Sequence, residues 1–499
     1  MSCVQLSFLP NVNEVQKPKG YKGLHAFHKY WGKKPLEPLA FLIDKLTVPG
    51  ALIVDPFMGS CASGVEALRL GRRFVGMDLN PLALRLGTVL ISPPSLSDVR
   101  EAFDEIEKRA KPLVQESYVS LSDESPITHY LWDSSKLIQM WVSNRSRTKR
   151  REHSPTDSDI ALFQKFEGYV PKQIRQPHFF SNSRINANPH LTLNDLFTGR
   201  ALRNLEILLD VISVLPPSQQ LPMQLSATAA SGQMSKMVFA ITRRGKTSGA
   251  LNQKIKIEVG SWVIGFWRPG LHFEINVWNC FESRVRKLVS AVGKLEKRSP
   301  PPKLGRISDT INSLATCSLI NADALAALTE FPDGSVDLIL TDPPHGDRIP
   351  YLELSELWNS ILGLEANFSD EIVVSNARER GKTKDTYNAK MKQFLELAAR
   401  KIKPSGAIAI LFNARDIASW EFLVVNDQMI VDNRTLRYMG HFPMEYSAGS
   451  VVQDSRAGGL KNDFALLFAF SDTSRYESLR SLSNWSTEMP SESGISKCR

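Results

Sequence analysis

The chain has 499 residues, enough for about two to four domains of ordinary size. Hydrophobic residues make up 42% and charged residues 23%, which excludes a collagen-like, coiled-coil or wholly disordered chain. No stretch approaches the roughly 18 consecutive apolar residues of a membrane span, so we expect no membrane association. The five cysteines are scattered and form no CxxC pair, which argues against disulfides and a zinc ribbon. The N-terminus lacks the features of a secretory signal, and we expect a cytoplasmic protein without a bound metal.

The net charge of +9 is concentrated in the middle of the chain. Residues 111–310 contain 28 Lys and Arg against 16 Asp and Glu, a net charge of +12 that leaves −3 for the remainder. A near-neutral frame with a basic insert is typical of a protein that binds a polyanion such as nucleic acid, because phosphate contacts supply most of the sequence-independent affinity. A solvated basic surface without a partner would give the same pattern.

The first regular pattern along the chain covers residues 51–78. A short apolar run at 51–54 ends at Asp55, a turn (PFMGS) follows, and the residues from 63 to 70 have the pattern of a helix. A second apolar run at 74–77 ends at Asp78. This succession of strand, Gly-containing loop, helix, strand and acid predicts the opening unit of a doubly wound α/β fold.

Residues 111–310 differ from the α/β portions on either side. They follow a helix predicted over 99–110 and contain a basic stretch at 145–151 that we expect to be a loop. Long helices are predicted over 194–215 and 275–297, strands over 254–259 and 261–267, and a proline-rich hinge over 299–303. Most of the aromatic residues of this region are expected to form its core, although some could present a stacking or wedge surface: Trp132, Trp141, Phe179, Phe180, Trp262, Phe266, Trp267, Phe273 and Trp278.

The α/β pattern resumes near the C-terminus. A buried-type strand at 336–341 is followed by a helix predicted over 385–403 and by strands at 407–412 and 464–470. From residue 471 onward 9 of 29 residues are Ser, so a disordered tail is expected there.

Two local patterns could carry chemistry. In a doubly wound fold the first loop lets a cofactor approach the backbone, which favours Gly59, and an acid that ends the second strand can bind ribose hydroxyls. Asp78 lies 19 residues after Gly59, close to the usual spacing. In the second pattern, Pro343 and Pro344 stop the strand at the carboxyl edge of the sheet and fix Asp342 there, where it could accept a hydrogen bond from an amino group of a planar substrate. A tight turn or a strand terminator would use the same residues.

These patterns resemble the amino-methylating DNA methyltransferases, which transfer a methyl group from S-adenosylmethionine to adenine N6 or cytosine N4. The segment at 28–35, HKYWGKKP, is similar to one that holds the methionine part of the cofactor. The cofactor loop, helix and ribose-binding acid of the family are similar to VDPFMGSCASGVEALRLGRRFVGMDLNPLAL. The catalytic segment of the family, normally DPPY, is similar to TDPPHGDRIPYLELSELW. NADA at 321–324 is similar to the segment whose acid contacts the adenine of the cofactor. The matched segments cover about residues 25–90 and 318–415.

The resemblance implies a Rossmann-like α/β methyltransferase core with a large target-recognition insert. The implied organisation is a cofactor half (1–110), a basic DNA-reading insert (111–310), a catalytic half (311–470) and a tail (471–499). It also implies double-stranded DNA as partner and flipping of the target base into a pocket at Asp342. The implied catalytic residues are Asp342, Pro343, Pro344 and His345, and the implied cofactor-binding residues are His28, Lys29, Tyr30, Asp55, Pro56, Phe57, Gly59, Ser60, Asp78, Leu79 and Asp323.

Two positions depart from the family pattern. Cys61 replaces a glycine, and its side chain is expected where the backbone approaches the cofactor. His345 replaces the aromatic residue that stacks on the flipped base, a role that its smaller planar ring could still fill.

Several alternatives stay open. An RNA base methyltransferase can share these motifs, although the large insert disfavours it, and a catalytically inactive DNA-binding protein would explain Cys61 and His345. The order of the motifs leans towards adenine N6 over cytosine N4. A restriction-modification setting with a separate cognate endonuclease is compatible with this reading, while the sequence does not determine the oligomeric state.

Overall fold

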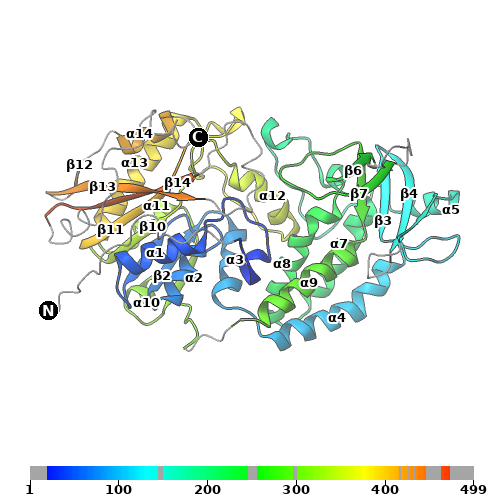
Figure 1. Ribbon diagram of the computed structural model, residues 1–499, viewed down its shortest axis with the longest axis horizontal. Coiled ribbons are helices and arrows are strands. Elements are labelled where there is room, and N and C mark those ends of the chain that lie inside the picture. The colour runs from blue at the N-terminus through cyan, green and yellow to red at the C-terminus, as the bar shows by residue number, and fades with distance from the viewer. Residues whose placement is uncertain are drawn as a thin grey trace, which may run out of the picture.

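The computed structural model describes residues 20–143, 150–244, 255–295, 300–414, 417–424, 428–431, 433–445 and 462–472. These residues form two lobes, each built around its own sheet (Figure 1). The predicted disordered tail, apart from its first two residues, and positions 145–149 of the basic stretch lie outside the described residues. In the described part of the chain, no helix is both long and apolar enough to cross a membrane.

The larger lobe contains a mostly parallel sheet of eight described strands. Its order is β12-β13-β14-β11-β10-β1-β2-β9, and the strands from β11 to β9 are parallel, whereas β14 runs antiparallel to both of its neighbours. The strands are β1 (Leu52–Asp55), β2 (Arg73–Asp78), β9 (Cys317–Asn321), β10 (Val336–Thr341), β11 (Ile402–Phe412), β12 (Gln428–Val431), β13 (Arg434–Glu445) and β14 (Asn462–Phe470). The predicted strands at 51–54, 74–77, 336–341, 407–412 and 464–470 are therefore confirmed.

Helices cover both faces of this sheet, as alternating burial along its strands requires. In β11, Ala407 and Ala409 face one hydrophobic cluster, and Ile408 and Ile410 face the other. The first cluster includes side chains of α1 (Leu36–Leu46), α2 (Ala62–Arg69), α3 (Pro81–Ile91) and α12 (Tyr351–Ile361). The second includes side chains of α10 (Ile307–Ile311), α11 (Ala324–Leu328), α13 (Lys384–Lys401) and α14 (Glu421–Val424). The predicted doubly wound α/β arrangement is confirmed, and its central strands β1 and β10 are adjacent.

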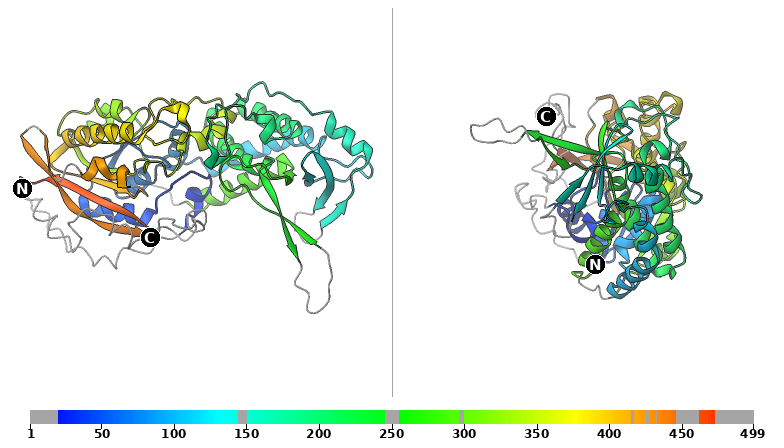
Figure 2. Two further views of the ribbon diagram at one scale, coloured as in Figure 1. Left: turned by 90° about the horizontal axis from the view of Figure 1, so that it is seen from above. Right: turned by 90° about the vertical axis from the view of Figure 1, so that its right-hand side faces the viewer.

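The smaller lobe interrupts this fold between α3 and α10. Four of its helices pack against one another: α4 (Leu96–Gln115), α7 (Gly199–Ser213), α8 (Pro217–Met234) and α9 (Val277–Val292). Beside them lie the short helices α5 (Asp157–Gln164) and α6 (Leu193–Leu196) and an antiparallel sheet in the order β5-β4-β3-β8-β6-β7. Its strands are β3 (His129–Asp133), β4 (Lys136–Ser143), β5 (Arg150–His153), β6 (Val238–Arg244), β7 (Ile255–Val259) and β8 (Leu271–Ile275). The hairpin of β6 and β7 projects from the body of this lobe (Figure 2).

In this lobe one predicted helix is confirmed only in part, and one predicted strand is wrong. The helix predicted over 194–215 is broken, because Phe197 and Thr198 are extended and the Thr198 side chain caps a new helix by accepting from the backbone N–H of Ala201. The strand predicted over 261–267 is a loop. Gly265 has φ +70° there, and the indole of Trp262 donates to its carbonyl, so the segment turns back on itself instead of extending.

Candidate active site

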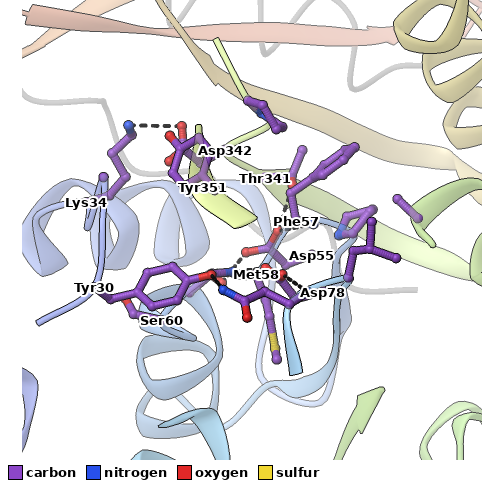
Figure 3. Close-up of a pocket in the computed structure, with 18 of the residues that line it drawn as sticks. Tyr30, Lys34, Asp55, Phe57, Met58, Ser60, Asp78, Thr341, Asp342 and Tyr351 are labelled. Carbon is purple, nitrogen blue, oxygen red and sulfur yellow. Dashed lines mark hydrogen bonds and ion pairs between the residues drawn. The ribbon is translucent and has the colours of Figure 1, made fainter. Parts of the chain in front are cut away.

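The candidate site lies where the carboxyl ends of β1, β2 and β10 meet at one edge of the large sheet. The chain leaves β1 towards β2 on one side and reaches β10 on the other, so the strand order reverses between β1 and β10. Open α/β sheets bind ligands at such a switch point. Figure 3 shows the residues that converge on it.

Asp55 joins the two central strands at this edge. Its carboxylate accepts hydrogen bonds from the hydroxyl of Thr341 at the end of β10 (2.6 Å), from the backbone N–H of Phe57 (3.1 Å) and from the hydroxyl of Ser63 in α2. Burial of the side chain raises the pKa of Asp55 to about 7, although the three hydrogen-bond donors act to lower it. Asp55 therefore fixes the start of the loop after β1 and holds it to the end of β10.

The loop at 56–60 is shaped by Gly59 and Asp78. Gly59 has φ +49°, a conformation that strains other residues, and a Cβ there would lie 3.3 Å from the ring of Tyr30. Its backbone N–H donates to the Asp78 carboxylate at 2.8 Å, as does the N–H of Asn80. Burial raises the pKa of Asp78 to about 6. The loop and the acid predicted from the spacing are thus joined directly.

A cavity opens over this edge and contains about 920 Å3 of empty space, part of which is open solvent at its mouth. Most of the predicted site residues line it: Tyr30, Asp55, Pro56, Phe57, Gly59, Ser60, Asp78, Leu79, Asp323, Asp342 and Pro344. Its lining also includes Lys34 and Tyr351, which the sequence analysis did not single out.

The structure places His28 and Lys29 outside the cavity lining. The His28 ring is buried, bonds to the hydroxyl of Thr228 in α8 at 3.0 Å and meets Trp358 edge-on. Burial lowers the pKa of His28 to about 3, so the ring is neutral. The ammonium of Lys29 lies 4.6 Å from the ring of Trp31 and 4.8 Å from that of Trp262. Both residues hold the N-terminal segment against the smaller lobe, and neither lines the cavity.

Asp342 lies in a buried network of charges that the sequence analysis missed. The ammonium of Lys34 bridges the carboxylates of Asp342 (3.0 Å) and Asp463 (2.7 Å). Asp463, in β14, also pairs with Arg348 at 2.9 Å, and these cations hold its pKa far below the usual range. The only sequence signal for Asp463 was an acid directly before a buried strand, and its partners are more than 100 residues away.

His345 lies behind Asp342, not in the cavity. Arg348 can only donate, so its contact with Nδ1 at 3.0 Å fixes the proton of His345 on Nε2. Nε2–H then faces Asp342 Oδ1 at 2.9 Å and the carbonyl of Leu411 at 3.1 Å. The side chain is 1% exposed, so the ring is not placed where a base could stack on it. The buried ring holds the carboxylate of Asp342 in position, and Tyr351 is the aromatic residue that lies beside Asp342 in the cavity (Figure 3).

Pro343 is absent from the cavity lining, and its neighbour Pro344 is held from behind. The hydroxyl of Tyr387 in α13 donates to the carbonyl of Pro344 at 2.6 Å. The turn after β10 is therefore anchored to the helix layer beneath it, which fixes the direction of the Asp342 side chain.

The side chain of Cys61 was expected to crowd the cavity, but it does not. It adopts the left-handed conformation with φ +62°, which explains why a glycine suits this position. Its side chain is fully buried and points towards two helix glycines: a Cβ on Gly64 would lie 2.7 Å from its sulfur, and one on Gly87 would lie 3.1 Å from its Cβ. The small residues around it leave room for the thiol on the side away from the cavity.

Asp342, His345 and Asp463 offer ligand atoms within 4.8 Å of one another, a spacing that could hold a metal ion. However, the ammonium of Lys34 and the guanidinium of Arg348 already lie beside these carboxylates. The cluster is therefore neutralised by side chains, and its geometry is that of a buried ion-pair network.

Comparison with known proteins finds similarity in the N-terminal part of the chain. Residues 7–88 match the N6/N4 DNA methylase family, described as DNA methylase. This segment includes β1, β2 and the loop of Gly59.

Individual relatives match over short segments. The chain is 40% identical over 62 residues to the type II methyltransferase M2.DpnII of Streptococcus pneumoniae, covering 12% of this chain and 23% of that protein. It is 45% identical over 47 residues to the putative methylase YubD of Escherichia coli K12 (9% and 21%), and 39% identical over 54 residues to the type II methyltransferase M2.LlaDCHI of Lactococcus lactis subsp. cremoris (10% and 20%). The matched segments thus span only about a fifth of each relative.

Proposed function

We propose that this protein is a DNA methyltransferase that transfers a methyl group from S-adenosylmethionine to the exocyclic amino group of a flipped base. One observation carries the proposal: a single cavity is lined both by the Gly59 loop with Asp78 and by Asp342. A ribose-binding acid and an acceptor for an amino group therefore face the same space, at the switch point of the sheet.

The residues present suit this cofactor. Gly59 allows the close approach of a ligand to the backbone, and the carboxylate of Asp78 can accept hydrogen bonds from ribose hydroxyls. Asp323, which caps α11, lies at the same cavity and offers an acceptor for an adenine amino group. When bound, S-adenosylmethionine supplies an electrophilic methyl group on its sulfonium sulfur.

The proposed role of Asp342 follows from its partners. Lys34 and the Nε2–H of His345 both contact Oδ1, which leaves Oδ2 to accept a hydrogen bond from the amino group of the substrate. Such a bond orients the nitrogen lone pair away from the carboxylate, towards an electrophile on the other side. Because its partners are buried, the acceptor is preorganised, and positioning supplies most of the rate enhancement.

The substrate proposal is double-stranded DNA, bound through the smaller lobe and the basic residues of 111–310. The exocyclic amine of a stacked base is inaccessible, so the target nucleotide rotates out of the helix into the cavity. Adenine N6 is the favoured atom and cytosine N4 the second candidate. The short matches to two type II methyltransferases support a restriction-modification setting.

The test is incubation of the purified protein with methyl-labelled S-adenosylmethionine and either unmethylated plasmid DNA or total RNA, followed by nucleoside mass spectrometry. We expect labelled N6-methyladenine or N4-methylcytosine in the DNA sample. Label in RNA alone would replace this proposal with an RNA methyltransferase. Binding of both DNA and cofactor without label in either sample would indicate a catalytically inactive DNA-binding protein.

A further inference from the structure

Trp267 differs from the other aromatic residues of the smaller lobe. The side chains of Trp132, Trp141, Phe179, Phe266, Phe273 and Trp278 are buried, and Phe180 and Trp262 are partly buried. The side chain of Trp267 is 53% exposed, although the residue before it is 1% exposed. The expectation that most of these aromatic residues form the core is thus confirmed, and Trp267 is the exception.

The loop that carries Trp267 is firmly built. The ring of Trp262 packs over Gly232 so closely that a Cβ there would lie 2.1 Å from it. Gly265 lies against Ile185, and the backbone N–H of Phe266 donates to the carbonyl of Ile185 at 2.7 Å. The ring of Phe266 packs against that of Phe179, with centroids 4.5 Å apart. The contacts of Trp262, Gly265 and Phe266 therefore hold the backbone that leads into Trp267.

The same loop is connected to the candidate active site. Arg184, next to Ile185, donates to the carbonyls of Asp347 and Arg348, which lie shortly after the proposed catalytic motif. Trp262 meets Trp358 of α12 and Trp31 edge-on. Trp267 is thus presented by a loop that packs against the elements flanking the cavity.

The immediate surroundings of Trp267 suit a nucleic acid. Its ring lies beside that of Phe239, with centroids 6.2 Å apart. Phe239 is the second residue of β6, the first strand of the hairpin with β7. The next residue is Arg268, whose exposed guanidinium pairs only at the surface with Asp195. This pair can be exchanged for a phosphate at small cost. The region from 111 to 310 has a net charge of +12, which favours an anionic partner over a second copy of the same basic surface.

We propose that Trp267 stacks on the base of duplex DNA that lies next to the flipped target nucleotide. That base has lost its stacking neighbour, because the target has rotated out of the helix. This inference rests on the proposed function and adds the surface that keeps the duplex open. Every base has a π face, and a rigid aromatic side chain loses little entropy on stacking. Arg268 then contacts the adjacent phosphate.

The test compares Trp267→Ala and Trp267→Phe with the control Val214→Ala, which removes another exposed apolar side chain of the same lobe. Affinity is measured on a duplex that the wild type methylates, and opening of the site is followed by the fluorescence of 2-aminopurine beside the target base. We expect Trp267→Ala to weaken DNA binding by about tenfold, within the range for loss of one base stack, and to reduce the 2-aminopurine signal. Trp267→Phe should retain most of both, and Val214→Ala should match the wild type.

Tryptophan fluorescence gives a second readout. The difference between wild type and Trp267→Phe isolates the emission of this exposed indole, and duplex DNA should quench it. Unchanged affinity in Trp267→Ala, or emission that DNA does not alter, would overturn the inference while methyl transfer stayed intact. Loss of a concentration-dependent dimer in Trp267→Ala would also overturn it and identify a second copy as the partner. Absence of DNA binding by the wild type would instead overturn the proposed function.

Discussion

The replacement of Asp342 by asparagine tests the proposed chemistry at one oxygen atom. Asp342 Oδ1 accepts from Lys34 at 3.0 Å and from His345 at 2.9 Å. In Asp342→Asn the amide oxygen can keep both contacts, so the amide NH2 takes the place of Oδ2. A donor would then face the amino group of the substrate, where the carboxylate had offered an acceptor.

The magnitude follows from this single exchange. Loss of one preorganised hydrogen-bonding partner of the reacting group costs about 100- to 1,000-fold in kcat, or roughly 2.7–4 kcal/mol. The fold should survive, because Lys34 keeps Asp463 at 2.7 Å and His345 keeps the carbonyl of Leu411 at 3.1 Å. We expect at most about 3 kcal/mol of lost stability, the value of a charged hydrogen bond.

Single-turnover methyl transfer, calorimetric binding of S-adenosylhomocysteine and urea unfolding separate these effects. Asp333→Asn, which changes an exposed aspartate of the same lobe paired with Lys401, is the matched control. The reasoning predicts slow transfer with unchanged cofactor affinity in Asp342→Asn and wild-type values in Asp333→Asn. Transfer by Asp342→Asn within tenfold of the wild type would refute it.

Three further outcomes are expected. Burial raises the pKa of Asp78 to about 6, so its carboxylate is protonated as the pH falls through 6. Calorimetry should therefore show weaker binding of S-adenosylhomocysteine in acid. Asp78→Asn should bind this ligand weakly, and its affinity should lack this pH step. Cys61→Gly should leave kcat/KM unchanged, because the thiol points away from the cavity, and a large rise in activity would contradict that placement. Arg200→Met should lower the free energy of unfolding in urea by about 3–5 kcal/mol, because it leaves Glu274 buried without its 2.8 Å partner. Arg286→Met, which removes one member of an exposed ion pair, should lower it by no more than about 1 kcal/mol.

The local part of the site could be predicted from the sequence. Gly59, Asp78 and Asp342 each follow a short buried strand, and parallel strands bring their carboxyl ends to one edge. Local strand and loop signals around each of these residues therefore suffice to predict that they meet at one edge of the sheet.

The rest depends on contacts between distant segments. Lys34 and Asp463 meet only because β14 inserts beside β11, which no local pattern indicates. His345 was expected to stack on a base, but Arg348 and Phe412 determine where its ring lies. The segment at 261–267 has the composition of a strand, and packing of Trp262 on Gly232 turns it into a loop.

The most direct test of the central claim is a crystal structure of the protein with S-adenosylhomocysteine. The account predicts the ligand in the cavity, with its ribose hydroxyls bonded to Asp78 and its sulfur directed towards Asp342 with an open space between them for the base. A ligand bound at another place, or one whose sulfur points away from Asp342, would contradict the claim that one cavity serves both the cofactor and the target amine.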